Sequence, residues 1–98
     1  MMDYKDMLSY LLSNGKALSV FKTISNSPNS FTEIKEILKI KFNPELSRIL
    51  QKLGNYGLIY NIFKRGNPSN YYSFYHISPT GETIMKFLSD IENILPST

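Results

Sequence analysis

Apolar side chains recur at helical spacing in five segments of the chain. Tyr4, Leu8 and Leu11 share one side of the first segment, and the last segment carries a similar apolar stripe from Ile84 to Leu95. Polar residues occupy the opposite sides, as expected for helices that cover a core. We predict helices at about residues 3–13, 16–25, 31–39, 43–56 and 80–95.

Residues that begin or end helices separate these segments. The pair Asn14–Gly15 is a C-terminal stop signal for the first helix. The run from Ser30 to Glu33 fits a capping box, in which a hydroxyl and a carboxylate satisfy each other's backbone donors. Asn43 can cap the fourth helix, and Pro44 suits its first turn because its missing N–H costs nothing there. Ser78–Pro79 can start the last helix.

The pattern changes to that of strands after Gly57. Residues 58–63 and 71–77 are rich in β-branched and aromatic side chains, and residues 64–70 between them form a turn that begins with Lys64 and Arg65. We therefore expect a β-hairpin with a basic tip, and a loop over the turn-forming residues 25–29. The predicted fold class is mostly α with a small β-hairpin (α+β).

The fourth predicted helix has two chemically different faces. Its apolar stripe consists of Leu46, Ile49, Leu50 and Leu53. The opposite face displays hydroxyl, guanidinium, amide and ammonium groups, from Ser47, Arg48, Gln51, Lys52 and Asn55. These are the groups that read base edges and hold phosphates, so this segment is a candidate recognition helix.

Composition and charge narrow the class of protein. Ninety-eight residues form one domain, and 42% hydrophobic with 19% charged residues argue against disorder. No apolar run approaches the roughly 18 residues of a membrane span, and the N-terminus lacks the pattern of a signal peptide. The absence of cysteine excludes disulfides and Cys-ligated zinc. We expect a cytoplasmic protein without membrane attachment.

The net charge of +3 is concentrated in the middle of the chain. Between residues 35 and 65 only Glu36 and Glu45 are acidic, whereas seven residues are basic, which leaves a net charge of +5. The basic residues are Lys35, Lys39, Lys41, Arg48, Lys52, Lys64 and Arg65. This segment includes the candidate recognition helix, so the charge favours contact with phosphates over a merely solvated surface.

The residue types of common catalytic and metal sites are missing. His76 is the only histidine, so a multi-histidine metal site cannot form, and we expect it to pack on its strand. The carboxylate pairs Asp3/Asp6 and Asp90/Glu92 have no nucleophile or histidine nearby in sequence. No phosphate-binding glycine loop or nucleophile elbow occurs. We expect no enzyme, no metal and no cofactor.

The order of elements resembles that of the winged helix-turn-helix domain. Two short helices joined by a tight turn (about 31–56) precede a hairpin, or wing (about 58–78). The run Leu46-Ser-Arg-Ile-Leu50, the strand start Gly57-Leu-Ile59, the basic Lys64-Arg-Gly66 and the exit Tyr75-His-Ile-Ser-Pro-Thr-Gly81 carry the resemblance. The chain is similar to small MarR-like and related archaeal or archaeal-virus regulators, with extra N- and C-terminal helices. The resemblance implies binding of double-stranded DNA by a transcriptional regulator.

The resemblance also implies roles for individual residues. The residues implied for DNA contact are Thr32, Lys35, Lys41, Asn43, Ser47, Arg48, Gln51, Lys52, Lys64, Arg65 and Asn67. Asn43, Ser47, Arg48 and Gln51 would face the major groove, where Arg48 suits guanine and Gln51 suits adenine. Lys41 and Lys52 would contact phosphates, and Thr32 and Lys35 would hold the backbone. Lys64 and Arg65 would reach the backbone or the minor groove, supported by Asn67.

Two further expectations concern partners. The apolar stripes of the terminal helices (3–13 and 80–95) are wider than a small core needs, which predicts a homodimer through these helices. Two other functions stay open: a winged-helix module that binds proteins without reading DNA, and a single-strand binder that stacks bases on the tyrosine-rich hairpin. The aromatic cluster at residues 71–75 also leaves a small-molecule effector pocket open.

Overall fold

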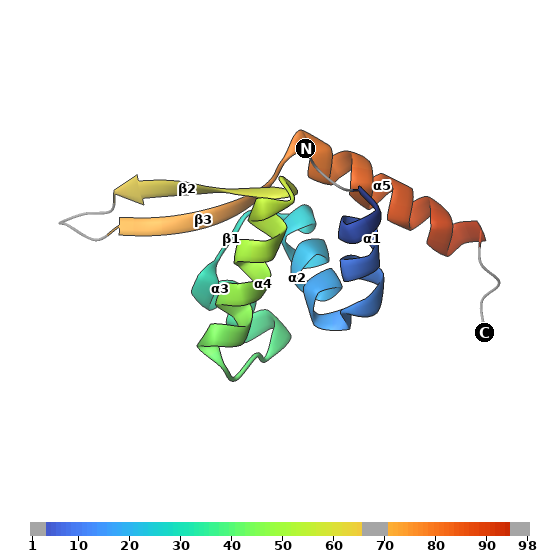
Figure 1. Ribbon diagram of the computed structural model, residues 1–98. Coiled ribbons are helices and arrows are strands. Elements are labelled where there is room, and N and C mark those ends of the chain that lie inside the picture. The colour runs from blue at the N-terminus through green and yellow to red at the C-terminus, as the bar shows by residue number, and fades with distance from the viewer. Residues whose placement is uncertain (1–3, 66–70, 95–98) are drawn as a thin grey trace.

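The computed structural model of the protein describes residues 4–65 and 71–94 (Figure 1). It contains helices packed around one core, with a sheet that extends to one side. This arrangement confirms the predicted α+β class. In chain order the elements are α1 (Tyr4–Ser13), α2 (Gly15–Asn26), β1 (Asn29–Ser30), α3 (Phe31–Leu38), α4 (Asn43–Asn55), β2 (Ile59–Arg65), β3 (Tyr71–Ile77) and α5 (Pro79–Ile94).

Asn14 separates α1 from α2, but by a different mechanism from the one predicted. Its side-chain oxygen accepts a hydrogen bond from the backbone N–H of Ala17 at 3.1 Å, so Asn14 is the N-cap of α2. Gly15 is the first residue of α2 and not a stop residue of α1. The expected stop signal is therefore a start signal for the next helix.

The capping box at the start of α3 forms as predicted. The Ser30 N–H donates to Glu33 Oε1 at 2.9 Å, and the Glu33 N–H donates to Ser30 Oγ at 3.2 Å. The helix ends at Leu38, and its C-cap is Lys39, whose backbone is left-handed with φ of 55°. This conformation lets the Ile40 N–H reach the Lys35 carbonyl at 3.0 Å, which closes the helix end.

The prediction that Asn43 caps α4 is wrong. The N-cap is Phe42, and Asn43 is already helical. The reason is that the carbonyl of Phe42 accepts the first hydrogen bond of the helix, from the Leu46 N–H at 3.4 Å. Pro44 thus lies at the second helical position, where its missing N–H would be unpaired in any helix.

The sheet has three antiparallel strands in the order β1-β3-β2. The short strand β1 pairs Asn29 with Tyr75 and Ser30 with Phe74, although the sequence predicted a loop up to Asn29. Lys64 and Arg65 were expected in the turn of the hairpin, but they are the last two residues of β2. They belong to the strand because their backbones continue the ladder opposite Tyr72 and Tyr71.

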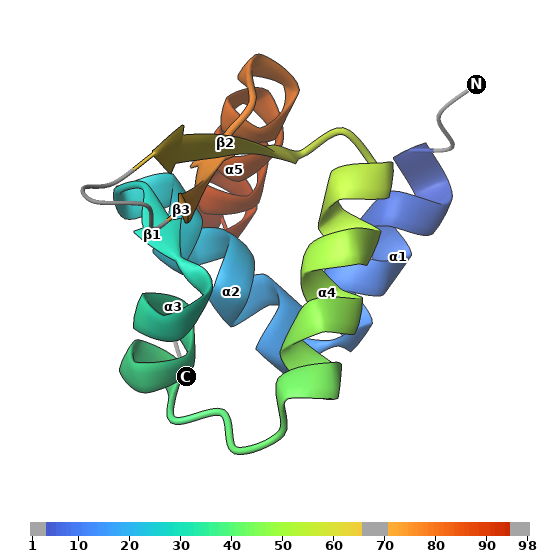
Figure 2. The same ribbon diagram turned by 90° about the vertical axis from the view of Figure 1, so that its left-hand side faces the viewer.

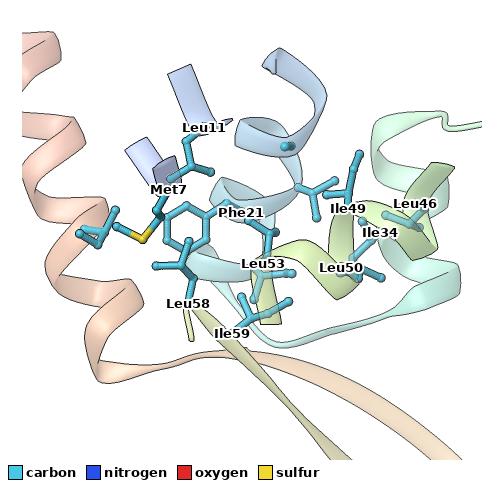
Figure 3. Packing of buried hydrophobic residues seen from close by; sticks show 14 of the residues in the cluster. Met7, Leu11, Phe21, Ile34, Leu46, Ile49, Leu50, Leu53, Leu58 and Ile59 are labelled. Atoms are coloured by element: carbon cyan, nitrogen blue, oxygen red, sulfur yellow. The ribbon is translucent and has the colours of Figure 1, made fainter. Parts of the chain in front are cut away.

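The apolar stripe of α4 is buried as predicted. Its four members belong to the apolar core of the protein, together with Phe21, Ile34, Leu58 and Ile59 (Figure 3). Burial of one leucine or isoleucine contributes about 1.5–3 kcal/mol. These contacts fix α4 along its whole length and leave its polar side outside. The buried stripe consists of Leu46, Ile49, Leu50 and Leu53.

Ser78 joins the end of α4 to the start of α5. Its N–H donates to the Leu58 carbonyl at 2.9 Å, and its hydroxyl donates to the Gly57 carbonyl at 2.5 Å. The same hydroxyl accepts from the Gly81 N–H at 2.9 Å, which caps α5. Gly57 has φ of 75°, a conformation that favours glycine. The base of the hairpin is therefore held by three hydrogen bonds of Ser78, one from its N–H and two that involve its hydroxyl.

Candidate nucleic-acid interface

The turn 39–42 joins α3 to α4, and α2 is seen between the two helices in Figure 2. Because successive helical residues are rotated by about 100°, Arg48, Gln51 and Asn55 lie opposite the buried stripe. All three are exposed. The polar side of α4 is thus free along at least two turns, as expected for a recognition helix.

One flank of this side borders a groove with the sheet. The groove has a volume of about 330 Å³ and contains Ser47, Gln51 and Asn55, which follow one another at intervals of four residues. The strands contribute Asn61 and Tyr75 to the opposite wall. Hydroxyl and amide groups from two elements therefore face one space between α4 and the hairpin. Leu50, Gly54, Ile59 and Tyr60 complete the lining.

The other flank faces α1, where the predicted phosphate ligand Lys52 lies. Its Nζ is 5.7 Å from the centroid of the Tyr10 ring and 5.8 Å from that of the Tyr56 ring. The two rings are 6.0 Å apart and tilted by 44°. A cation over aromatic faces is attracted by their quadrupoles, so Lys52 also links α4 to α1. Arg48 shares this flank and lines a hollow of about 380 Å³ with Tyr10 and Lys52.

The single acidic side chain of α4 is neutralised within the protein. Glu45 Oε1 accepts a hydrogen bond from Lys16 Nζ of α2 at 2.9 Å. Within the described part of the chain, Arg48 takes part in no such ion pair. The guanidinium is consequently left for an external acceptor, while the carboxylate that would repel a phosphate is compensated.

The remaining predicted residues lie on three separate elements. Thr32 is exposed and Lys35 half-buried on α3, while Lys41 is exposed in the turn 39–42. Asn43 is exposed at the first position of α4. Lys64 and Arg65 end β2, and Asn67 lies outside the described residues. The structure thus groups Ser47 with Gln51 and Arg48 with Lys52. The other predicted residues that it describes lie on α3, in the turn 39–42, at the first position of α4 and at the end of β2.

Several residues of this surface were not among the predicted DNA contacts. The sequence placed Asn55 on the polar face of the fourth helix but not among those contacts, although it continues the row of Ser47 and Gln51 at intervals of four residues. Asn61 was hidden because only the strand register places it on the wall that faces α4; its amide oxygen accepts a hydrogen bond from the Ser73 hydroxyl. Phe42 is 70% exposed beside the start of α4, and its apolar character gave no reason to include it.

Two tyrosines beside these hollows have shifted pKa values. Burial raises the pKa of Tyr10, and the neighbouring Tyr56 raises it further. Burial also raises the pKa of Tyr75. The hydrogen bond with Ser73 lowers this pKa, but by less than burial raises it. Both phenols are therefore protonated at neutral pH and available as hydrogen-bond donors.

The described residues contain no cluster of three or more histidine, aspartate or glutamate side chains that could hold a metal ion. Across the same residues, none of the helices has both the length and the apolar character required to cross a membrane.

These elements define a winged helix-turn-helix fold. The helices α3 and α4 form the helix-turn-helix unit, and β2 and β3 form the wing beside α4. Neither a model of a known protein family nor a curated protein matches the sequence.

Several solved structures that match this fold are transcriptional regulators. YodB from Bacillus subtilis matches with a TM-score of 0.78 and 17% identity, over 95% of this chain and 90% of YodB. PadR from Bacillus subtilis, solved in complex with operator DNA, matches with a TM-score of 0.68 and 12% identity, over 87% of this chain and 50% of PadR. The regulator BldR from Sulfolobus solfataricus matches with a TM-score of 0.61 and 15% identity, over 87% of this chain and 65% of BldR.

At these identities the similarity establishes the fold. The predicted resemblance to winged helix-turn-helix regulators is confirmed. The MarR-like label is only approximate, since the similar structures include PadR and an ArsR-family regulator.

Proposed function

We propose that this protein is a cytoplasmic transcriptional regulator that binds double-stranded DNA sequence-specifically and without catalysis. The observation that carries the proposal is the exposed polar side of α4, which is flanked by the groove to the wing and lies in the most basic part of the chain. A fold shared with PadR, which was solved on operator DNA, supports it. In this proposal α4 enters the major groove and the wing follows the backbone or the minor groove.

The individual roles follow from side-chain chemistry. Arg48 donates two hydrogen bonds to guanine O6 and N7, and Gln51 pairs with adenine N6 and N7. Asn43 and Ser47 contact base edges or the adjacent backbone. Thr32, Lys35, Lys41 and Lys52 contact phosphates and the backbone, which fixes the register of the protein on the duplex. Lys64 and Arg65 reach the backbone or the adjacent minor groove, with Asn67 in support.

We also propose that the protein acts as a homodimer through its terminal helices. Tyr4 and Leu12 of α1 are 55% and 62% exposed, and Phe87 of α5 is 47% exposed. Large apolar side chains on both helices suit a second copy as partner. A two-fold axis would place two α4 helices about 34 Å apart, which matches a palindromic site.

A second candidate function is a protein-docking module that does not read DNA. Phe63, an apolar residue of β2 that is 70% exposed, favours it. In that case the basic middle of the chain would bind an acidic protein, and duplex DNA would bind weakly and without sequence preference.

Selection of duplexes from a random pool, followed by binding measurements across a salt series, separates the two functions. We expect Arg48→Ala to weaken binding to the selected site by about 1–3 kcal/mol and to relax specificity at one base pair. Lys64→Ala should lower the salt slope by about 0.9, the value for one phosphate contact. Lys86→Ala on the exposed part of α5 is the matched control and should leave the slope unchanged. Binding that is absent, or unaffected when Arg48→Ala and Lys64→Ala are combined, contradicts DNA recognition.

A further inference from the structure

The turn 39–42 buries one apolar residue and exposes another. Ile40 is 6% exposed and belongs to the core, whereas Phe42, two residues later, is 70% exposed. The helix-turn-helix unit is therefore anchored through Ile40, and the Phe42 ring contributes little to the core. An aromatic ring exposed to water loses the favourable burial that such a side chain usually supplies.

The side chain of Phe42 has no capping role that would explain its position. It is the N-cap of α4, but it makes no side-chain hydrogen bond to the helix, and residues such as Ser, Thr, Asp and Asn are preferred there. Its extended backbone, with φ of −106° and ψ of 114°, leads directly into the first turn of α4. The ring thus lies at the end of the recognition helix that contacts base edges in helix-turn-helix proteins.

The charges around Phe42 indicate the kind of partner. Lys39 and Lys41, in the same turn, are exposed and form no ion pair among the described residues. The helix N-terminus adds a partial positive charge, and Glu45 is compensated by Lys16. A polyanion that displays apolar groups between its phosphates would match both the exposed Phe42 ring and the positive charge around it. On the base edges of duplex DNA, the apolar group of the major groove is the 5-methyl of thymine.

We propose that Phe42 packs against thymine 5-methyl groups and makes the protein prefer A·T pairs at the end of the site read by the start of α4. The inference rests on the proposed DNA-binding function, and it adds a specificity residue that makes no hydrogen bond. Phe42 acts through van der Waals contact and exclusion of water, while Arg48 and Gln51 read by hydrogen bonds.

The test compares the selected duplex with the same duplex in which deoxyuridine replaces thymidine. This exchange keeps base pairing and removes the methyl groups alone. For the wild type we expect about fourfold weaker binding for each methyl contacted, which corresponds to about 0.8 kcal/mol. Phe42→Ala should bind both duplexes equally, and Phe42→Leu should retain part of the difference. Ile37→Ala, a change of another exposed apolar residue at the end of α3, should retain all of it.

The outcomes distinguish this inference from the function on which it rests. If the wild type binds the thymidine and deoxyuridine duplexes equally, while Arg48→Ala still weakens binding, the methyl contact is overturned and DNA recognition stands. If Phe42→Ala keeps the wild-type ratio, the methyl effect arises elsewhere and the assignment to Phe42 is overturned. Tighter binding to the single strands, lost in Phe42→Ala, would mean base stacking and overturns it too. No duplex binding at all overturns both proposals.

Discussion

Lys16 of α2 neutralises Glu45, the only acidic side chain of α4, through a 2.9 Å contact between Nζ and Oε1. Both side chains are substantially exposed, so the pair contributes little to stability. Its main effect is on the field at the start of α4, where a free carboxylate would oppose an approaching phosphate. The pair thus leaves α4 without an uncompensated negative charge.

The first prediction concerns this pair. Glu45→Gln should strengthen duplex binding, because it removes the negative charge, and Lys16→Met should weaken it, because it exposes that charge. Each change should alter the free energy of unfolding by less than about 0.5 kcal/mol. Binding at low and high salt and urea unfolding measure both quantities. A Glu45→Gln variant that binds more weakly than the wild type would contradict the electrostatic role.

Lys52 should differ from Arg48 in its effect on stability. Since the Lys52 ammonium lies over the rings of Tyr10 and Tyr56, Lys52→Ala should lower the free energy of unfolding by about 0.5–1 kcal/mol. Arg48 is exposed on the same flank, about one helical turn away. Arg48→Ala should change the free energy of unfolding by no more than about 0.5 kcal/mol. Denaturant unfolding of both variants provides the comparison. Equal stabilities would show that the ring contacts contribute nothing.

Gly81 should tolerate no side chain. A Cβ at this position would lie 2.2 Å from the Leu58 carbonyl oxygen and 2.7 Å from Ile77 Cγ1, at the junction formed by Ser78. We expect Gly81→Ala to destabilise the protein by about 2 kcal/mol or more. The control is Gly54→Ala in α4, where no atom lies within 4 Å of the added Cβ. That change should stabilise by about 0.4–1 kcal/mol. A Gly81→Ala variant as stable as the wild type contradicts the tight junction.

The stability of the protein should fall above about pH 10, partly because of Tyr10. The folded-state pKa of Tyr10 is raised, so the unfolded chain loses this proton at lower pH than the folded chain. Stability due to Tyr10 is therefore complete below the unfolded pKa and declines as the pH rises through the folded pKa. The Tyr10→Phe variant should show a smaller decline than the wild type, because it has no phenol at this position to lose a proton. Unfolding at several pH values measures the difference.

If the protein is the homodimer that we propose, its mass in solution should depend on the exposed apolar residues of α1 and α5. We expect the wild type to sediment at twice 11.3 kDa, and the double change Leu12→Ser with Phe87→Ser to shift it to the monomer. Phe63→Ser removes an exposed ring from β2 and should leave the dimer intact. Wild-type protein that remains an 11.3 kDa species at micromolar concentration would overturn the proposed dimer.

The sequence pattern predicted the helices and the hairpin because hydrophobic spacing is a local property of the chain. The stripe of α4 and the capping box at Ser30 depend on residues within seven positions of each other, and both are found as expected. Strand β1 was missed because two residues have no periodicity, and Asn29 and Ser30 become a strand only by pairing with β3.

The candidate site was less accessible to sequence reasoning. The polar face of α4 was evident, but its neighbours on either flank come from distant segments. Lys52 meets Tyr10 across 42 positions of sequence, and Asn61 faces α4 only through the strand register. The first residue of α4 also depends on which carbonyl accepts the Leu46 N–H, and side-chain preference at Asn43 did not reveal that.

Ser30 belongs to two elements at once. It is the strand residue opposite Phe74, and its hydroxyl and N–H complete the cap of α3. No linker residue separates the sheet from the helix-turn-helix unit at this point, so a shift of β3 along its axis must pull on the first turn of α3. The hairpin and the helix-turn-helix unit are therefore directly coupled. A force on the hairpin would tilt α3.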